Sequence, residues 1–454
     1  MSSRTLALCL LLAAALSSAE PCPVAPRADR LDTAGLKELA QRRLEARSEG
    51  YPFARVTIVA ERDTSSWRLT CDEEPGERHL VAAPVNVDSS RSSDAVFARL
   101  AGWRAGRFWR PGELEEMERK VLRTGYFVPT APARWRAVPR RNLLRPEFSM
   151  RDAPTATLRV DLATEEGRDL PSGVVAVEWL NLLGTARDLS FRYSSLSERL
   201  VAELSFREPP LFALGPALRV TAAVRSETDE FDSFRGEAAL EWEGAVLGAA
   251  LKAGGERVEE RPAGGGGETR DSWWGSVEAT ADLRDPLPVA ARGGRLGAEF
   301  SWRHSDSEDP WLLWSARWDW LTRVTPRALA LRARGRVASR WPWRAGLRPE
   351  SAYDWGGANS LRGYREQAFR SASYALFSLQ PEWSPAASVA FFPFLDGAFD
   401  WALSAPGTEV RRWGWGAGAR WSREGQTVGL AAGWPGANFS LTDAVLHLSW
   451  ESRF

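Results

Sequence analysis

An arginine in a Gly-rich segment is the residue whose type and setting best predict a specific contact. Arg362 lies in the sequence GGANSLRGYREQAF, which runs from Gly356 to Phe369 between segments that alternate apolar and polar residues. A guanidinium group presents a planar fork that can pair with both oxygens of a carboxylate. Gly363 allows another backbone to come close, and Tyr364 can pack and also donate a hydrogen bond. We therefore predict a long loop that is held in place through Arg362.

Groups that could do catalytic or metal chemistry are scarce. The chain has three cysteines and three histidines, which are His79, His304 and His447. Ser305 and Ser449 each lie close in sequence to one of the last two, but no motif joins a nucleophile, a base and an orienting acid. His and Cys are also too few for a metal-ligand cluster. We expect a protein that is not an enzyme and that holds no cofactor and no metal.

The first residues predict export from the cytoplasm. Arg4 is followed by an apolar run from Leu6 to Leu16 and by the small residues Ser17, Ser18 and Ala19. This order is typical of a secretory signal peptide, which we assign to residues 1–19. The run is far shorter than the roughly 20 residues that a membrane-spanning helix needs.

Two cysteines, Cys22 and Cys71, follow the signal peptide. Both would reach the oxidising periplasm, where they could form one disulfide. Two separate thiols are the alternative, and the sequence does not decide between them.

Composition limits how the exported chain could cross a membrane. The net charge is zero, the mean hydropathy is −0.33 and the chain contains 23 Trp. No later segment is apolar enough for a spanning helix, so only a closed β-barrel could span the bilayer with its backbone groups paired. Many Trp residues suit the aromatic girdles of such a barrel. The balanced charge argues against nucleic acid as a partner.

Residues 173–454 have the period-two pattern of barrel strands. In one such segment Leu218, Val220, Ala222 and Val224 alternate with Arg219, Thr221 and Arg225. One apolar and one polar face suit a lipid-facing wall and a wet lumen, although a soluble sandwich can show the same period. The signal peptide, the Trp content and about sixteen such segments favour a transmembrane antiparallel β-barrel. Its last strand is expected over residues 443–454.

Residues 31–165 mix helix and strand patterns instead. A helical stripe at 36–46 and two short strands predict a first, partial unit over residues 31–74. A fuller unit over residues 77–165 is expected to run strand, helix, helix, strand, strand. Its helices are predicted at 94–103 and from Pro111 to Gly125, and its strands at 79–87, 134–139 and 156–163.

Two stretches of this region resemble POTRA domains, which are small periplasmic modules. They are GYPFARV at residues 50–56 and LAGWRAGRFWRPGELEEMERKVLRTGYF at residues 100–127. The resemblance implies one or two small α+β POTRA-like domains before the barrel. Any other small α+β domain with a glycine helix cap is the alternative.

The loop segment carries the more specific resemblance. GGANSLRGY is similar to the motif in the sixth extracellular loop of the BamA/TamA superfamily of outer-membrane assembly factors, which join periplasmic POTRA domains to a sixteen-stranded barrel. EWLNLLGTARDLSF and LSFREPPLF resemble that family's first hairpin and the end of its third strand. The resemblance implies that residues 351–370 fold into the barrel, with Leu361, Arg362, Gly363 and Tyr364 as the loop motif.

The resemblance also suggests an acid that pairs with the loop arginine. PFLDGAF, at residues 393–399, is similar to the strand that receives this arginine, which makes Asp396 the implied partner. The glycine of that pattern, here Gly397, comes one place early, so Asp400 is the alternative. At the end of the chain Leu448, Trp450 and Phe454 share one face, and this resembles the signal read by the outer-membrane assembly machinery.

The function that follows from the resemblance is the assembly of other outer-membrane proteins. Such a factor takes unfolded client polypeptides in the periplasm, meets outer-membrane lipid and can have periplasmic or lipoprotein partners. Its first and last barrel strands, expected here at residues 173–182 and 443–454, would form a weak seam. A two-partner secretion transporter for a soluble client is the alternative, although residues 20–31 leave little room for its plug helix. A passive porin is less favoured, because porins lack domains like residues 31–165.

Overall fold

The computed structural model describes two compact units of the chain. The described residues are 49–62, 67–74, 76–163, 172–196, 199–210, 215–228, 230–244, 246–261, 267–284, 293–306, 308–325, 328–341, 352–386, 388–400, 410–437, 440 and 443–454. One unit comprises residues 1–84, 104–115 and 133–147, and the other comprises 85–103, 116–132 and 148–454. The predicted signal peptide, the helical stripe at 36–46 and Cys22 lie outside the described residues, and so does the side chain of Cys71.

Residues 49–152 form short strands and two helices. Strands β1 (Arg55–Arg62) and β2 (Trp67–Glu74) pair as an antiparallel hairpin. A separate sheet contains β3 (Leu80–Val81), β4 (Val85–Asn86), β5 (Phe127–Val138) and β6 (Leu143–Asp152), in which β6 pairs with each of the other three. The helices are α3 (Asp94–Leu100) and α4 (Glu113–Arg123).

The two helices are held by a small aromatic core. Phe97 of α3 is fully buried, and its ring centroid lies 4.5 Å from that of Phe127 and 6.5 Å from that of Phe148. Val121 and Met117 of α4 are buried as well. Both helices lie within the ranges that the sequence predicted, and Ser93 occupies the N-cap position of α3.

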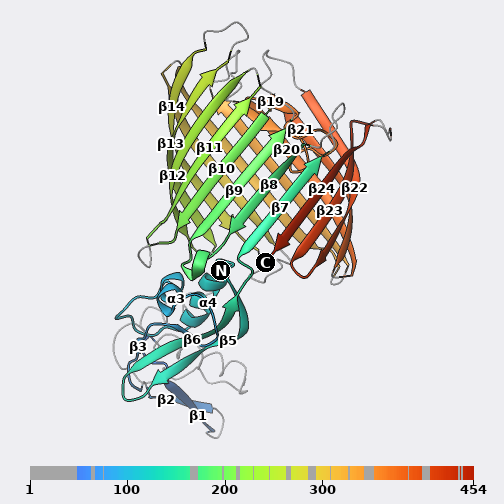
Figure 1. Ribbon diagram of the computed structural model, residues 1–454. Helices are drawn as coiled ribbons and strands as arrows, with labels where there is room; N and C mark the ends of the chain where they lie inside the picture. The colour runs from blue at the N-terminus through green and yellow to red at the C-terminus, as the bar shows by residue number, and fades with distance from the viewer. Residues whose placement is uncertain are drawn as a thin grey trace, which may run out of the picture. The chain divides into compact units, whose positions relative to one another are not determined.

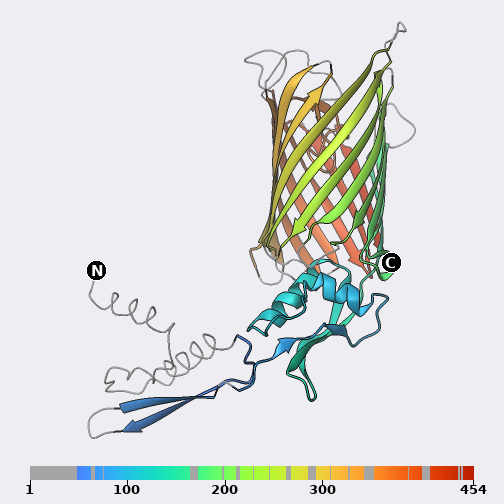
Figure 2. The same ribbon diagram turned by 90° about the vertical axis from the view of Figure 1, so that its left-hand side faces the viewer.

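A closed antiparallel barrel of sixteen strands follows, as the sequence predicted (Figure 1). In both views the strands of the wall are tilted relative to the barrel axis (Figure 2). They are β7 (Ala156–Ala163), β8 (Ser172–Trp179), β9 (Asp188–Leu196), β10 (Arg199–Glu208), β11 (Ala217–Glu227), β12 (Phe231–Glu243), β13 (Leu247–Glu260), β14 (Thr269–Asp282), β15 (Gly293–Ser305), β16 (Glu308–Arg323), β17 (Leu329–Trp341), β20 (Ser373–Ala386), β21 (Val389–Asp400), β22 (Val410–Arg423), β23 (Gln426–Pro435) and β24 (Val445–Arg453).

The start of the barrel differs from the prediction. Strand β7 was assigned to the α+β unit at residues 77–165, and the barrel was expected to begin near residue 173. The structure pairs β7 with β8 on one side and with β24 on the other, so β7 is the first barrel strand. The α+β sheet is complete without β7, because the twelve-residue strand β5 pairs with β6. The sequence pattern had not predicted β6.

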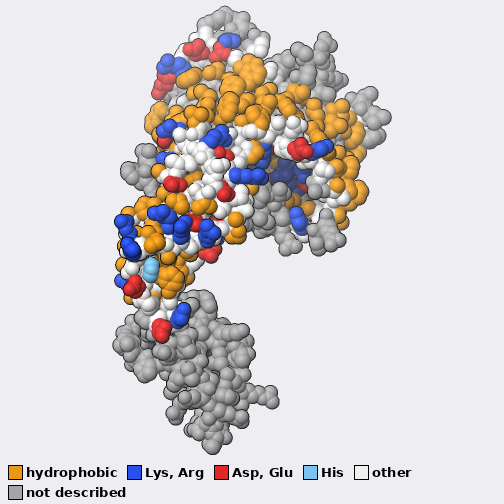
Figure 3. All heavy atoms as spheres, turned by 60° about the horizontal axis from the view of Figure 1, so that its bottom comes forward, with side chains coloured by type: hydrophobic (Ala, Val, Ile, Leu, Met, Phe, Trp, Pro, Cys, Tyr) orange, Lys and Arg blue, Asp and Glu red, His pale blue; other side chains and the backbone are white. Residues whose placement is uncertain are grey.

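The barrel wall has an apolar outside and a polar inside. Val277 and Phe300 on the outer face are 54 % and 60 % exposed, whereas Ser276 and Ser301 beside them are buried. Hydrophobic side chains, in orange, cover much of the outer wall in Figure 3. So large an exposed apolar surface is stable only against lipid, which identifies the barrel as the membrane-spanning part. No helix among the described residues is both long enough and apolar enough to cross a bilayer.

The turn between β8 and β9 is fixed by a buried asparagine. Asn181 has a φ of 50° and is fully buried, and it precedes the 3-10 turn η1 (Leu182–Gly184). Its side-chain oxygen accepts a hydrogen bond from the backbone N–H of Ala186 at 2.7 Å, and its amide donates to Ser92 at 3.0 Å. Asn tolerates this left-handed conformation better than most residues. The NLLGT stretch singled out in the sequence is therefore a turn with defined geometry.

The segment between β17 and β20 contains a folded loop. Its ends pair as the short strands β18 (Tyr353–Trp355) and β19 (Phe369–Ser371). Trp355 and Leu361 of the loop are buried in one apolar cluster with Tyr374 and Leu376 of β20. Because these side chains of β20 point into the barrel, the loop packs inside the lumen.

Candidate functional site: a loop anchored inside the barrel

Arg362 is held by a buried carboxylate on the barrel wall. The side chain of Arg362 is 6 % exposed and that of Asp396 on β21 is 1 % exposed. The Nε and one terminal nitrogen of Arg362 each donate to one oxygen of Asp396 at 2.8 Å, and the backbone N–H of Arg362 donates to the same carboxylate at 3.0 Å. This bidentate geometry is the strongest form of an arginine–carboxylate contact.

Neighbouring side chains complete the hydrogen bonding of the guanidinium group. Arg362 also donates to Gln380 at 2.7 Å and to Ser378 at 3.0 Å, and both of these residues are on β20. The Arg362 Cζ atom lies 3.6 Å from the centroid of the Phe394 ring. A buried cation is tolerated only when it is paired and hydrogen-bonded in this way, so the site fixes the position of Arg362 closely.

Glycines let the loop backbone lie directly against the wall. Gly363 has a φ of +91°, and a Cβ there would come within 2.6 Å of the Trp434 carbonyl oxygen. A Cβ at Gly433 would come within 2.6 Å of the Gly363 nitrogen, and one at Gly414 would overlap the carbonyl oxygen of Arg362. Strands β22 and β23 therefore form a surface that admits the loop only because both of these wall positions lack a side chain.

The other residues of the loop motif contribute packing. Leu361 is fully buried in the cluster with Trp355 and Tyr374. The ring of Tyr364 packs on Phe369, with 5.0 Å between the ring centroids. Asp400, the alternative acid, lies four residues after Asp396 on the same inward face of β21 and is also buried. The hydrogen bonds of the Arg362 side chain go to Asp396, Gln380 and Ser378.

A second polar cluster fixes the base of the loop to another sector of the barrel. Asp354 of β18 accepts hydrogen bonds from Arg225 at 3.1 Å and from Arg370 at 3.1 Å, and it forms an ion pair with Arg199 at 2.9 Å. Arg370 of β19 also donates to Glu227 at 2.6 Å. Arg199, Arg225 and Glu227 belong to β10 and β11, so the loop bridges β10–β11 and β20–β23 across the lumen.

The tip of the loop reaches the first barrel strand. Arg159 of β7 donates a hydrogen bond to the side-chain oxygen of Asn359 at 3.2 Å and forms an ion pair with Asp161 of the same strand at 2.8 Å. Glu366 of the loop accepts the backbone N–H of Ala358 at 2.5 Å. Burial raises the pKa of Glu366 to about 6, and the nearby negative charge of Asp161 adds to this rise.

Strands β7 and β24 close the barrel over a short length. They pair over seven positions, from Thr157 opposite Arg453 to Ala163 opposite His447. The backbone of Phe454 extends this pairing, since its N–H donates to the Ala156 carbonyl oxygen at 2.9 Å. Leu448 and Phe454 are 40 % and 67 % exposed, on the outer face of this closing strand. Trp450 lies on that face as well, directly opposite Val160.

Sequence reasoning missed most of the residues around the anchor. Ser378, Gln380 and Phe394 are ordinary members of alternating strands, and Asp354 and Arg370 are ordinary polar residues of a loop. The only signal that could have found them is their position at inward-facing places near the loop motif. Among the described residues no group of three or more His, Cys, Asp or Glu side chains is arranged to hold a metal ion.

Comparison with known proteins gives matches in structure alone. No family model matches the sequence, and no curated protein matches it at a significant level. Structures of CdiB from Acinetobacter baumannii and from Escherichia coli match with TM-scores of 0.66 and 0.63 and identities of 11 % and 14 %. Each match covers 93 % of this chain, and 82 % and 85 % of the CdiB chains.

BamA from Haemophilus ducreyi lacking POTRA domains 1–3 matches as well. Its TM-score is 0.57, its identity is 12 %, and the match covers 94 % of both chains. Identities this low show a common fold and nothing finer. The chain therefore has the sixteen-stranded barrel fold of BamA and CdiB, as its resemblance to the BamA/TamA superfamily implied.

Proposed function

We propose that this chain is a bacterial outer-membrane factor that takes unfolded polypeptide clients from the periplasm and inserts them into the membrane. It would do so without enzymatic chemistry and without a cofactor. The fold shared with BamA supports this proposal, and so does the loop that is anchored inside the barrel. Residues 49–152 would then be the periplasmic part and would act as POTRA-like modules.

The observation that carries the proposal is the contact between the anchored loop and the closing strand pair. The loop is fixed to β21 through Arg362, and its tip touches β7 through the bond between Arg159 and Asn359. Strand β7 is one half of the short β7–β24 pair. A client that enters at this pair would meet strands whose position depends on the loop.

Insertion at the closing pair follows from backbone chemistry. An open strand edge in lipid leaves N–H and C=O groups unpaired, and each such group costs several kcal/mol. If β7 and β24 separate, a client strand can pair with either edge through backbone hydrogen bonds, whatever its side chains are. The energy for release would come from the client's own closure into a barrel. No nucleotide is needed for these steps.

Conditional depletion of the protein, followed by quantitative proteomics of outer-membrane and secreted fractions, tests the proposal. An insertase predicts that several unrelated barrel proteins disappear from the membrane fraction. Restoring the wild-type chain should restore them, whereas a chain with a cross-linked β7–β24 pair should not. An unchanged membrane fraction after depletion would contradict the proposal.

A secretion transporter is the second candidate. Its support is that the chain shares its barrel fold with both CdiB structures as well as with the BamA structure. Under this alternative, depletion removes one soluble protein from the secreted fraction and leaves the membrane fraction intact. The signal peptide at residues 1–19, a Cys22–Cys71 disulfide and the terminal signal Leu448, Trp450 and Phe454 stay predictions under both candidates.

A further inference from the structure

The lumen wall formed by β15, β16 and β17 is rich in arginine. Leu296, Trp318 and Leu329 mark the outer face of these strands with exposures of 43 %, 37 % and 42 %, so the residues between them point inward. The charged side chains on this inward face that the structure describes comprise eight cations and two acids: Arg295, Arg303, Arg317, Arg323, Arg332, Arg334, Arg336, Arg340, Glu299 and Asp319.

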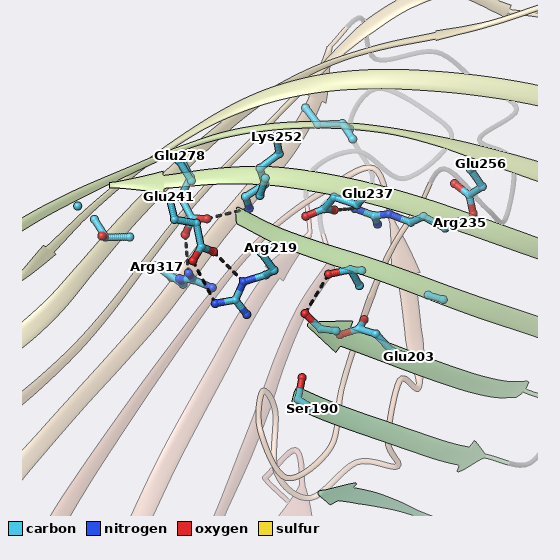
Figure 4. A pocket seen from close by; sticks show the side chains of 18 of the residues that line it. Ser190, Glu203, Arg219, Arg235, Glu237, Glu241, Lys252, Glu256, Glu278 and Arg317 are labelled. Carbon is cyan, nitrogen blue, oxygen red and sulfur yellow. Dashed lines mark hydrogen bonds and ion pairs between the residues drawn. The ribbon is translucent and has the colours of Figure 1, made fainter. Parts of the chain in front are cut away.

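The neighbouring wall has the opposite balance. The inward face of β11, β12 and β13 carries four cations and six acids: Arg219, Arg225, Arg235, Lys252, Glu227, Glu237, Glu241, Glu243, Glu256 and Glu260. Most of these groups pair with one another, as Arg219 does with Glu241 at 2.7 Å and Arg235 with Glu237 at 2.7 Å (Figure 4). Strand β14, between the two walls, points Arg270, Glu278 and Asp282 inward, so β11–β14 have a net negative inward charge and β15–β17 have a net positive one.

Several of these arginines have no acid of their own. Arg332 pairs with Asp319 at 2.6 Å and Arg317 pairs with Glu278 at 2.7 Å. Within the described part of the chain, no ion pair joins Arg295, Arg334 or Arg336 to a carboxylate. Cations that are close together and unpaired repel one another, and a bound anion with hydrogen-bond acceptors would relieve that repulsion.

The arginines are spaced like the side chains of an extended peptide. Arg332, Arg334 and Arg336 occupy alternate positions of one strand, so their Cα atoms are about 6.6 Å apart. Arg295 and Arg317 on the adjacent strands extend the same patch, since Asp319 lies opposite both Arg295 and Arg334, and Arg317 lies opposite Arg336. We call these five residues the arginine ladder. An extended polypeptide carries every second side chain at this same spacing.

Part of the ladder borders a cavity, and Arg332, Arg334 and Arg336 lie outside the lining of that cavity. Arg295 and Arg317 line a cavity of about 780 Å³ in the lumen, whose other walls include Glu241, Lys252 and Glu278. Figure 4 shows Arg317 beside Glu241 and Glu278 in this cavity, and Figure 3 shows Lys and Arg side chains, in blue, within the barrel opening. Arg336 is itself exposed.

We propose that the arginine ladder binds an extended acidic segment of a client polypeptide, one that carries a carboxylate at every second residue. The spacing favours such a segment over a small anion, because Arg295, Arg334 and Arg336 lie on two different strands and a single anion could satisfy only one or two of these three guanidinium groups. The inference rests on the proposed function and names the class of client segment that the barrel would hold.

Peptide binding to the purified full-length chain tests the ladder. We would measure the fluorescence anisotropy of labelled decapeptides that contain equal numbers of glutamate and serine, either alternating or in two blocks. The alternating peptide should bind more tightly than the block peptide, and added salt should weaken its binding. A decapeptide of alternating lysine and serine should not bind at the ladder.

Paired variants locate the binding. Arg334→Gln combined with Arg336→Gln should weaken binding of the alternating peptide at least about tenfold, which corresponds to 1.4 kcal/mol. Arg134→Gln combined with Arg136→Gln is the matched control, since it removes the same charge from exposed side chains of β5, outside the barrel, and should leave the affinity within about twofold. Circular dichroism would verify that both double variants form the barrel.

Three results would contradict the proposal that the arginine ladder binds an acidic segment. They are equal affinity for alternating and block peptides, displacement of the alternating peptide by inorganic phosphate at matched charge, and equal loss in both double variants. The measurement needs no assembly activity, so its outcome is independent of the depletion experiment. If depletion removes barrel proteins while the peptides do not bind, then the proposed peptide binding is wrong and the proposed function is unaffected. If the peptides bind while depletion has no effect, then the proposed function is wrong and the arginine ladder still binds acidic segments.

Discussion

The closing strands and the strands on another sector of the barrel differ in how far they pair. Strands β24 and β7 pair over seven positions, and their neighbours pair over eight on each side, as β7 with β8 and β23 with β24. Strands β12 and β13 pair over thirteen positions. A backbone hydrogen bond adds about 0.5–1.5 kcal/mol net to stability. The hydrogen bonds between β7 and β24 therefore contribute roughly half as much as those between β12 and β13.

The loop touches the short closing pair through its tip, whereas its anchor and base lie on longer-paired strands. Its anchor contacts β20 to β23 and its tip contacts β7. The parts of a protein that open first are those with the fewest stabilising contacts. We infer that the tip of the loop stabilises the closing pair, whose own strand pairing is short. The following predictions test the closing pair and the loop that reaches it, and two of them use the long-paired β12–β13 wall as the control.

The largest effect is expected from a covalent lock on the closing pair. Thr157→Cys with Arg453→Cys places two cysteines directly opposite each other on β7 and β24. Oxidation should abolish client insertion, because the strands can no longer separate, and reductant should restore it. Client assembly under depletion of the wild-type chain is the readout.

Ala238→Cys with Ala253→Cys is the matched lock on β12 and β13. Since these strands would stay paired throughout the proposed cycle, this cross-link should not reduce insertion. Equal activity of both locked chains would show that clients do not enter between β7 and β24.

Removing the loop arginine should have the next largest effect. Arg362→Ala leaves Asp396 buried without its cation, and breaking a buried pair in this way costs about 3–5 kcal/mol. The loop should become sensitive to added protease while the barrel stays folded. Adding Asp396→Ala should recover part of the loss, because the uncompensated charge is then gone. Unchanged protection in Arg362→Ala would mean that the anchor does not hold the loop.

A single methyl group distinguishes the two sectors. Gly414→Ala on β22 would push the loop backbone away, since its Cβ overlaps the Arg362 carbonyl oxygen, and overpacking of this kind costs about 1–3 kcal/mol. Gly236→Ala on β12 has no atom within 4 Å of the new Cβ and should be nearly neutral. Thermal unfolding of both variants measures the difference. Similar melting temperatures would argue against tight contact between the loop and β22.

The smallest effect is expected from pH. Burial raises the pKa of Glu366 to about 6 from an ordinary value of 4.5, so the docked loop favours the protonated carboxyl. Docking should be fully favourable below pH 4.5, weaken by up to about 2 kcal/mol as the pH rises to 6, and then stay constant. Hydrogen exchange of the loop amides, corrected for intrinsic rates, would report the change.

Glu366→Gln should remove this pH dependence without releasing the loop. The amide cannot ionise, and it can still accept the hydrogen bond from Ala358. If the variant keeps the same pH profile as the wild-type chain, then another group near β7 is responsible.

The sequence alone determined what depends on local periodicity and on a single motif. Alternation with a period of two predicts strands with one apolar and one polar face, and the number of such segments predicted a barrel of about sixteen strands, which the structure confirms. The loop motif pointed to Arg362 and to Asp396, and the structure places these two residues in contact.

Only the tertiary structure decided which strands are neighbours. A period-two segment looks the same in an α+β domain and in a barrel wall, and this is why β7 was placed in the wrong unit. The contacts of Asp354 with Arg199 and of Asn359 with Arg159 join residues more than 150 positions apart, and no local pattern encodes them. The arginine ladder arises in the same way, because three strands bring their cations together only when the barrel closes in one register.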